Sequence, residues 1–534
     1  MPGPDAGSGG GPNLNKLARG GALNLVGAGF AGVQGIAIVS VIAHLYSARL
    51  AGSFFAATSL FLILSAVAGL GTDAGLLRWL PRHLALGDRR AAGRTVPIAL
   101  VPVLATAAAG GLALALAAPW AAGHIGADDP DQVAGMLRVL AAFLPIAAAH
   151  DALLAVTRGH GAQRPTVLID KIVRQALQVA GVVAAAQVSG NAALLALAWV
   201  APYLPCLLAA IVWYRRIARR PVQAAGDGAE PVPFRLLAGD FWRFTAPRSI
   251  AQICQTAFQR ADIVLVAALS SPTEAAIYTA ATRFIPVSQL ATQAVQNVMQ
   301  PAVSRLMALD DKAGAQRIFA VCAAWNLALC WPVHLAIAVG APVYVGSFGE
   351  RYAGSGEIAT VILAMAMLVA TATGARDVML LMAGRSGLSL ANQGTALAVN
   401  LVLNVLLIPP LGIAGAALAR AGGLLVRTAL ALVQVRRILG MSPASSGLLW
   451  AAGSALTCFG AVPLAVRLAA GDGAGALFAG LVPGTVLYLV LLWFGRERLA
   501  LTAFTSLLPG RGGQKTAIAV PDPASARSIH VPGN

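Results

Sequence analysis

Fourteen apolar segments, each close to the length of a membrane-spanning helix, divide the chain of 534 residues. A helix needs about 20 apolar residues to cross a bilayer, and charged residues make up only 11% of this sequence, against about 25% in soluble domains. The sequence therefore predicts an all-α polytopic membrane protein. The predicted spans are 22–45, 54–75, 95–120, 133–156, 166–188, 192–214, 245–269, 277–301, 318–342, 358–380, 389–409, 413–434, 447–466 and 474–494.

The two halves of the chain resemble each other at a nearly constant offset. Residues 47–57 align with 270–280, 161–164 with 383–386, and 214–217 with 435–438. Repeated halves made of membrane helices are typical of secondary transporters, which hold their substrate between the halves. We expect one six-helix domain in residues 15–240, a second in 241–440, and two further helices in 441–500. The polar residues 1–14 and 501–534 are expected to be disordered.

The net charge of +17 follows the membrane topology. Basic residues concentrate in alternate connections between the predicted spans, as at Arg89, Arg90 and Arg94, whereas an opposite-side connection carries Asp128 and Asp129. This positive-inside bias places both termini in the cytoplasm and does not indicate nucleic-acid binding. The five cysteines lie in apolar spans without CxxC spacing, so we expect no disulfide, metal site or cofactor.

Two short motifs that are typical of nucleotide enzymes have simpler explanations here. The GxGxxG pattern at 27–32 lies inside the first predicted span, where small residues allow helices to pack closely. The acidic pair Asp129 and Asp131 lies on the predicted outer face, away from cytoplasmic nucleotide sugars.

None of the four lysines follows a glycine, so there is no P-loop. We expect an ion gradient, the membrane potential or the substrate gradient to supply the energy for transport.

Charged residues inside the predicted spans are the candidates for a functional site, because a charge in the bilayer usually faces a cavity or a partner. Arg260 lies deep in its span, where it either forms a structural ion pair or lines a cavity and binds an anion through its planar guanidinium. Lys171, Arg174, Arg376 and Arg427 lie near span ends, where we expect them to reach the membrane interface. The only acids at span depth in the first half are Asp73, Asp151 and Asp170.

Two sequence blocks resemble the polysaccharide flippase branch of the multidrug/oligosaccharidyl-lipid/polysaccharide exporter superfamily. The first is an R-x-D motif at 260–262, followed by G-x-Y-x-x-A-x-R ending at Arg283, with Ala276 in place of the usual glycine. The second is N-L-x-L-N at 400–404, followed by I-P-x-x-G-I-x-G-A-A-x-A at 408–419. With the span count and the repeat, the resemblance covers roughly residues 15–500.

The resemblance implies two six-helix bundles that form an inverted V around a central cavity. It also implies a flippase, not an enzyme, in the bacterial cytoplasmic membrane that moves undecaprenyl-pyrophosphate-linked oligosaccharide to the outer leaflet by alternating access. Membrane lipid, a glycan polymerase and glycosyltransferases of the same pathway are the expected partners. A similarity to lipid II flippases, which also have fourteen spans, implies that the last two helices hold the lipid tail.

On this reading, Arg260 and Arg283 contact the pyrophosphate or acidic sugars, and Arg248 and Arg420 are further candidate substrate ligands. Asp262 is expected to tune Arg260 or to carry a proton. The alternatives are a cation-coupled multidrug antiporter of the same superfamily, a lipid II-type flippase, a membrane-embedded polymerase or ligase, and a scaffold without transport activity. An antiporter requires a carboxylate site in the first bundle, and a polymerase requires large outer loops.

Overall fold

The computed structural model describes residues 14–125, 129–219 and 233–500, and these ranges contain helices and turns but no strand. The residues predicted to be disordered, 1–14 and 501–534, lie outside the described ranges except Leu14, where the first helix begins. Within the described residues, ten helices are long and apolar enough to cross a membrane. The predicted all-α polytopic fold is confirmed.

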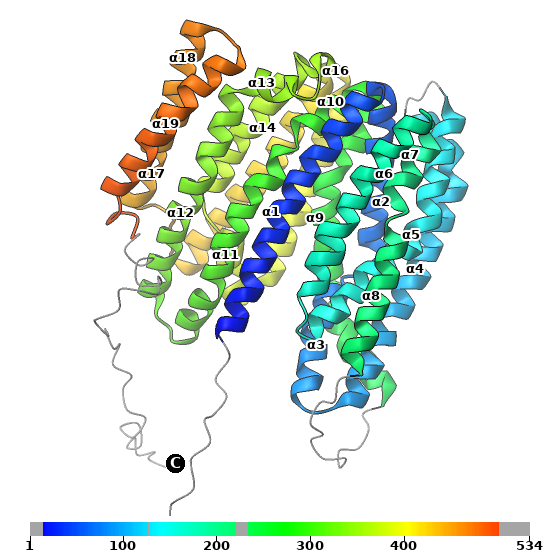
Figure 1. The fold of residues 1–534 in the computed structure, drawn as a ribbon. Helices are drawn as coiled ribbons and strands as arrows, with labels where there is room; N and C mark the ends of the chain where they lie inside the picture. Colours follow the sequence, from blue (N-terminus) through cyan, green and yellow to red (C-terminus); the bar gives the residue numbers. More distant parts are fainter. Residues whose placement is uncertain (1–13, 126–128, 220–232, 501–534) are drawn as a thin grey trace, which may run out of the picture.

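The first half of the chain forms one bundle of helices (Figure 1). Its elements are α1 (Leu14–Leu45), α2 (Ala48–Ala68), α3 (Thr72–Ala85), α4 (Arg89–His124), α5 (Pro130–Gly159), the π-helical η1 (Thr166–Arg174), α6 (Gln175–Val188), α7 (Ala192–Val200) and α8 (Tyr203–Ala218).

The second half forms a second bundle, followed by a helical hairpin that packs against α12. The bundle contains α9 (Phe234–Leu269), α10 (Pro272–Ala281), α11 (Phe284–Ala308), α12 (Lys312–Val339), α13 (Ala341–Gly346), η2 (Glu350–Tyr352), α14 (Ser355–Ala372), α15 (Arg376–Met382), α16 (Ser386–Gln434) and η3 (Val435–Leu439). The hairpin contains α17 (Ser446–Ala455), η4 (Leu456–Ala461), α18 (Val462–Ala470) and α19 (Ala474–Phe494). The domain boundary predicted after residue 240 falls inside α9.

The helix caps repeat between the two halves within one residue of the offset found in the sequence. Ser47 caps α2 through the Leu50 amide, and Ser271 caps α10 through the Glu274 amide. Asp88 and Asp311, 223 residues apart, cap α4 and α12 in the same way. A capping side chain satisfies an amide that the helix leaves without a partner, so these polar residues fix the same helix starts in both bundles.

Ten apolar helices account for fourteen predicted spans because α16 contains two spans and three other spans are too polar or broken. Gly412 interrupts α16 with φ 56° and ψ −134°, a backbone conformation that L-residues with a side chain rarely adopt. α9 carries several polar residues, α10 and α11 are separated at Arg283, and η1 continues into α6. Most of each predicted span lies in helix, but 54–75 crosses the turn between α2 and α3, and 358–380 crosses the turn between α14 and α15.

Glycines allow the two bundles to touch at several places. A Cβ atom on Gly52 of α2 would lie 1.5 Å from the Pro272 carbonyl oxygen of α10. On α3, Cβ atoms on Gly71 and Gly75 would lie 2.7 Å from the Ser249 nitrogen and 2.3 Å from the Thr245 hydroxyl of α9. Gly27 of the GxGxxG pattern packs against Val167 of η1, which confirms that this motif serves helix packing.

Replacing Gly52 with alanine should lower the melting temperature of the purified protein in detergent by several degrees. The new methyl group has no room beside Pro272, and overpacking of this kind costs about 1–3 kcal/mol. Gly29→Ala is the matched control, because a Cβ atom there meets nothing within 4 Å. Equal melting temperatures for the two variants would contradict the close α2–α10 contact.

Candidate functional site

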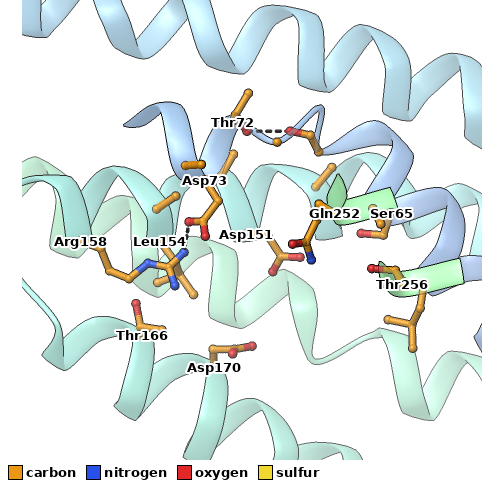
Figure 2. A pocket seen from close by; sticks show the side chains of 18 of the residues that line it. Ser65, Thr72, Asp73, Asp151, Leu154, Arg158, Thr166, Asp170, Gln252 and Thr256 are labelled. Atoms are coloured by element: carbon orange, nitrogen blue, oxygen red, sulfur yellow. Dashed lines mark hydrogen bonds and ion pairs between the residues drawn. The ribbon is translucent and has the colours of Figure 1, made fainter. Parts of the chain in front are cut away.

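A cavity of about 500 Å³ lies between the first bundle and α9. Its walls come from α2, α3, α5, η1 and α8 on one side and from α9 on the other. Figure 2 shows polar side chains from both sides that face this space, among them Ser65, Asp151, Asp170, Gln252 and Thr256. The second bundle thus contributes a single helix to a cavity that the first bundle otherwise surrounds.

The α9 wall of the cavity is a polar stripe. Its members recur at intervals of three or four residues, which places them on one face of the helix. They are Arg248, Gln252, Thr256, Gln259 and Arg260. Arg260 lies nine residues before Leu269, the end of α9, which corresponds to about 14 Å of helix. This is close to half of a hydrocarbon core that is about 30 Å thick.

Arg260 is a cation that lines the cavity. Among the described residues, its side chain makes no hydrogen bond and no ion pair, although it lines the cavity wall. The sequence left open whether Arg260 forms a structural pair or lines a cavity, and in the structure its side chain lines the cavity. A buried charge is stable only with a counter-ion or with water, so Arg260 is available to an anionic ligand.

Asp262 does not pair with Arg260 but is the centre of a separate buried network. The Tyr278 hydroxyl donates to its Oδ2 atom at 3.0 Å, and the Asn404 amide donates to its Oδ1 atom at 2.9 Å. The Arg420 Nη1 atom lies 3.4 Å from Oδ2 in an ion pair. Because α9, α10 and α16 each contribute a group, Asp262 and Arg420 hold the second bundle together.

Arg283 lies at the break between α10 and α11, outside the set of residues that line the cavity. Its Nε atom is buried and has no hydrogen-bond partner among the described residues. Arg260 and Arg420 are close enough to act on it electrostatically. Three guanidinium groups therefore share one region of the second bundle, and the Asp262 carboxylate is the counter-ion that contacts one of them.

The first-bundle wall carries three carboxylates, and two of them are neutralised by arginines. Arg158 donates to Asp73, as the dashed line in Figure 2 marks, and the Arg174 Nε atom donates to Asp170 at 2.7 Å. Among the described residues, the polar partner of the Asp151 carboxylate is the His150 ring, at 2.9 Å. Ligand atoms of His150, Asp151 and Asp170 lie within 4.8 Å of one another, but a metal ion there would compete with Arg174 for Asp170.

Arg174, Arg376 and Arg427, which we expect near the membrane interface, each find a partner within the protein. Arg174 pairs with Asp170 in the cavity. The buried Arg376 donates from Nη2 to the Thr428 hydroxyl at 2.9 Å. Arg427 forms an ion pair of 2.8 Å with Asp377. In lipid, partners inside the protein replace the water that a charged group would otherwise need.

Sequence reasoning missed several polar residues that line the cavity. Gln252, Thr256 and Gln259 could have been found, because with Arg248 and Arg260 they form a stripe at helical spacing in an otherwise apolar span. The convergence of Asp73, Asp151 and Asp170 had no comparable signal. These acids are on different helices, and no local pattern relates them.

The comparisons with known proteins agree with this geometry. Residues 99–355 match the family model described as "Polysaccharide biosynthesis protein". The solved structure of the lipid II flippase MurJ in its inward closed conformation is similar with a TM-score of 0.66 and 12% identity, over 88% of this chain and 98% of that chain. The chain therefore shares the fold of this solved structure.

Other solved structures of the MOP fold are similar as well. An inward-facing multidrug resistance MATE family transporter has a TM-score of 0.57 and 16% identity, over 78% of this chain and 94% of that chain. A MOP superfamily transporter from Pyrococcus furiosus has a TM-score of 0.55 and 15% identity, over 80% of this chain and 95% of that chain. No curated protein matches the sequence. The family description and the shared fold agree with the resemblance found in the sequence.

Asp262→Asn should lower the stability of the purified protein markedly, because it leaves the charge of Arg420 buried without a carboxylate. Breaking a buried ion pair in this way costs about 3–5 kcal/mol. Asp310→Asn is the control, since its ion pair with Lys312 is highly exposed and such pairs contribute about 0–1 kcal/mol. Adding Arg420→Met to Asp262→Asn should restore part of the loss, and no restoration would argue against the pair. Thermal unfolding in detergent measures all four proteins.

Proposed function

We propose that the protein is a flippase for polyprenyl-pyrophosphate-linked oligosaccharide. On this proposal it is embedded in the bacterial cytoplasmic membrane with both termini in the cytoplasm, and it delivers the lipid-linked glycan to the outer leaflet by alternating access. The observation that carries the proposal is Arg260, a cation about halfway along the span, in a cavity between two helical bundles, with no partner in the described part of the chain.

The charge distribution supports an anionic substrate. Arg260, Arg283 and Arg420 lie within electrostatic range of one another, and only Arg420 contacts Asp262. Like charges in a low-dielectric region repel strongly, and a bound phosphate group relieves that repulsion. Guanidinium binds phosphate oxygens in a bidentate manner. In this proposal Arg260 and Arg248 contact the substrate, and Arg283 and Arg420 strengthen the positive potential around it.

The polar stripe of α9 supports a glycan headgroup. Gln252, Thr256 and Gln259 supply hydroxyl and amide groups along the cavity wall between Arg248 and Arg260, and sugars present hydroxyl groups that pair with both. The family description "Polysaccharide biosynthesis protein" and the similarity to a lipid II flippase support a lipid-linked precursor. We assign the lipid tail to the apolar hairpin of α17, α18 and α19.

A cation-coupled multidrug antiporter is the second candidate, because Asp73, Asp151 and Asp170 line the cavity and multidrug transporters share the fold. Two of these carboxylates are already neutralised by Arg158 and Arg174, so the wall offers little net negative charge to a cationic drug. Drug resistance on overexpression, with unaltered glycan synthesis on deletion, would favour the antiporter over the flippase.

Arg260→Gln should reduce transport of a polyprenyl-pyrophosphate oligosaccharide in proteoliposomes by at least roughly tenfold, since it removes the charge-assisted hydrogen bonds to the anion. Arg260→Lys should retain an intermediate rate, because it keeps the charge but loses the bidentate geometry. Arg243→Gln is the matched control, as Arg243 is exposed on the same helix and does not line the cavity. A full rate for Arg260→Gln would refute the assignment.

A further inference from the structure

A pair of arginines from opposite bundles shares one aromatic ring near the cavity. The guanidinium carbon of Arg78, on α3, lies 4.1 Å from the centroid of the Phe244 ring on α9. The guanidinium carbon of Arg248, which lines the cavity, lies 4.4 Å from the same centroid. These distances leave at most about 8.5 Å between the two guanidinium carbons.

Neither arginine is neutralised within the described part of the chain. Both side chains are exposed, and neither has an ion pair or a hydrogen bond among the described residues. Contact with an aromatic ring orients a guanidinium group but does not cancel its charge. Two adjacent positive charges with free N–H donors attract an anion, and one phosphate group between them reaches both through charge-assisted hydrogen bonds of about 2.7–2.9 Å.

The position of the pair along α9 corresponds to the level of lipid headgroups. Arg248 lies 21 residues before Leu269, which is about 32 Å of helix and matches a hydrocarbon core of about 30 Å. Arg260 lies twelve residues further along the same cavity wall. The pair is therefore at one membrane boundary, and Arg260 is deeper, about halfway across.

The backbone contacts between α3 and α9 fix this arrangement. Gly71 and Gly75 of α3 lie directly against Ser249 and Thr245 of α9, with no room for a Cβ atom. Arg78 and Arg248 each lie within one turn of these contacts, so the packing of the helices sets their separation. Since the two arginines belong to different bundles, any relative movement of α3 and α9 changes the distance between them.

We propose that Arg78, Phe244 and Arg248 form a clamp that binds the pyrophosphate group of a lipid in the cytoplasmic leaflet before the headgroup moves to Arg260. The lipid and its direction of movement rest on the proposed function, whereas the anion clamp rests on the geometry alone. The clamp adds Arg78 and Phe244 to the substrate-binding residues and defines a loading step at the mouth of the cavity.

The test measures binding of farnesyl pyrophosphate, a short-chain polyprenyl pyrophosphate, to the full-length protein in phosphatidylcholine nanodiscs. Arg78→Gln and Arg248→Gln should each weaken binding by roughly tenfold or more. The double variant should bind about as weakly as either single variant, because each arginine depends on the other. Arg82→Gln is the control, since Arg82 is one turn away on α3 and contacts Trp79, not Phe244.

Three results would overturn the clamp: unchanged binding in the single variants, losses that multiply in the double variant, or no binding to the wild-type protein. Phe244→Leu keeps the net charge, so weaker binding in this variant supports the ring geometry and unchanged binding contradicts it. If inorganic pyrophosphate binds as tightly as farnesyl pyrophosphate, the clamp remains an anion-binding site, but the proposal that its ligand is a lipid is rejected. If the protein binds farnesyl pyrophosphate as predicted but transports no glycan, the proposed function is refuted and the clamp is not.

Discussion

The cost of a charge in a lipid environment is the constraint on which the rest of this structure depends. Charged groups within the spans reduce this cost by forming ion pairs, as Asp262 does with Arg420 and Arg427 does with Asp377. Arg260 meets it differently, because it faces a cavity and has no partner among the described residues. Arg283 also has no ion pair among the described residues, but it does not line the cavity. The proposed function therefore rests on Arg260, which combines the lack of a partner with a place in the cavity wall.

Local sequence patterns predicted the helices and the repeat, because both depend on residues close in sequence. Ser47 and Asp88 mark helix starts by capping, and their counterparts Ser271 and Asp311 mark the same starts in the second half. The depth of Arg260 was also predictable from its distance to the end of an apolar span.

The partners of the deep charges were not predictable, because pairing depends on contacts between distant helices. Asp262 and Arg420 are 158 residues apart, and no periodicity connects them. Arg174 and Arg376 lie near span ends, where long side chains usually reach water, yet each has a partner inside the protein. The shared contact of Arg78 and Arg248 with Phe244 likewise arises only when the two bundles meet.

The most direct test of the account is the sidedness of lipid-linked glycan after depletion of the protein. Polyprenyl-linked oligosaccharide would be extracted, and its accessibility from outside the cytoplasmic membrane would be probed before and after depletion. The account predicts that intact intermediate accumulates on the cytoplasmic side. Normal amounts with normal sidedness would contradict it and would leave the multidrug antiporter as the better explanation of the fold.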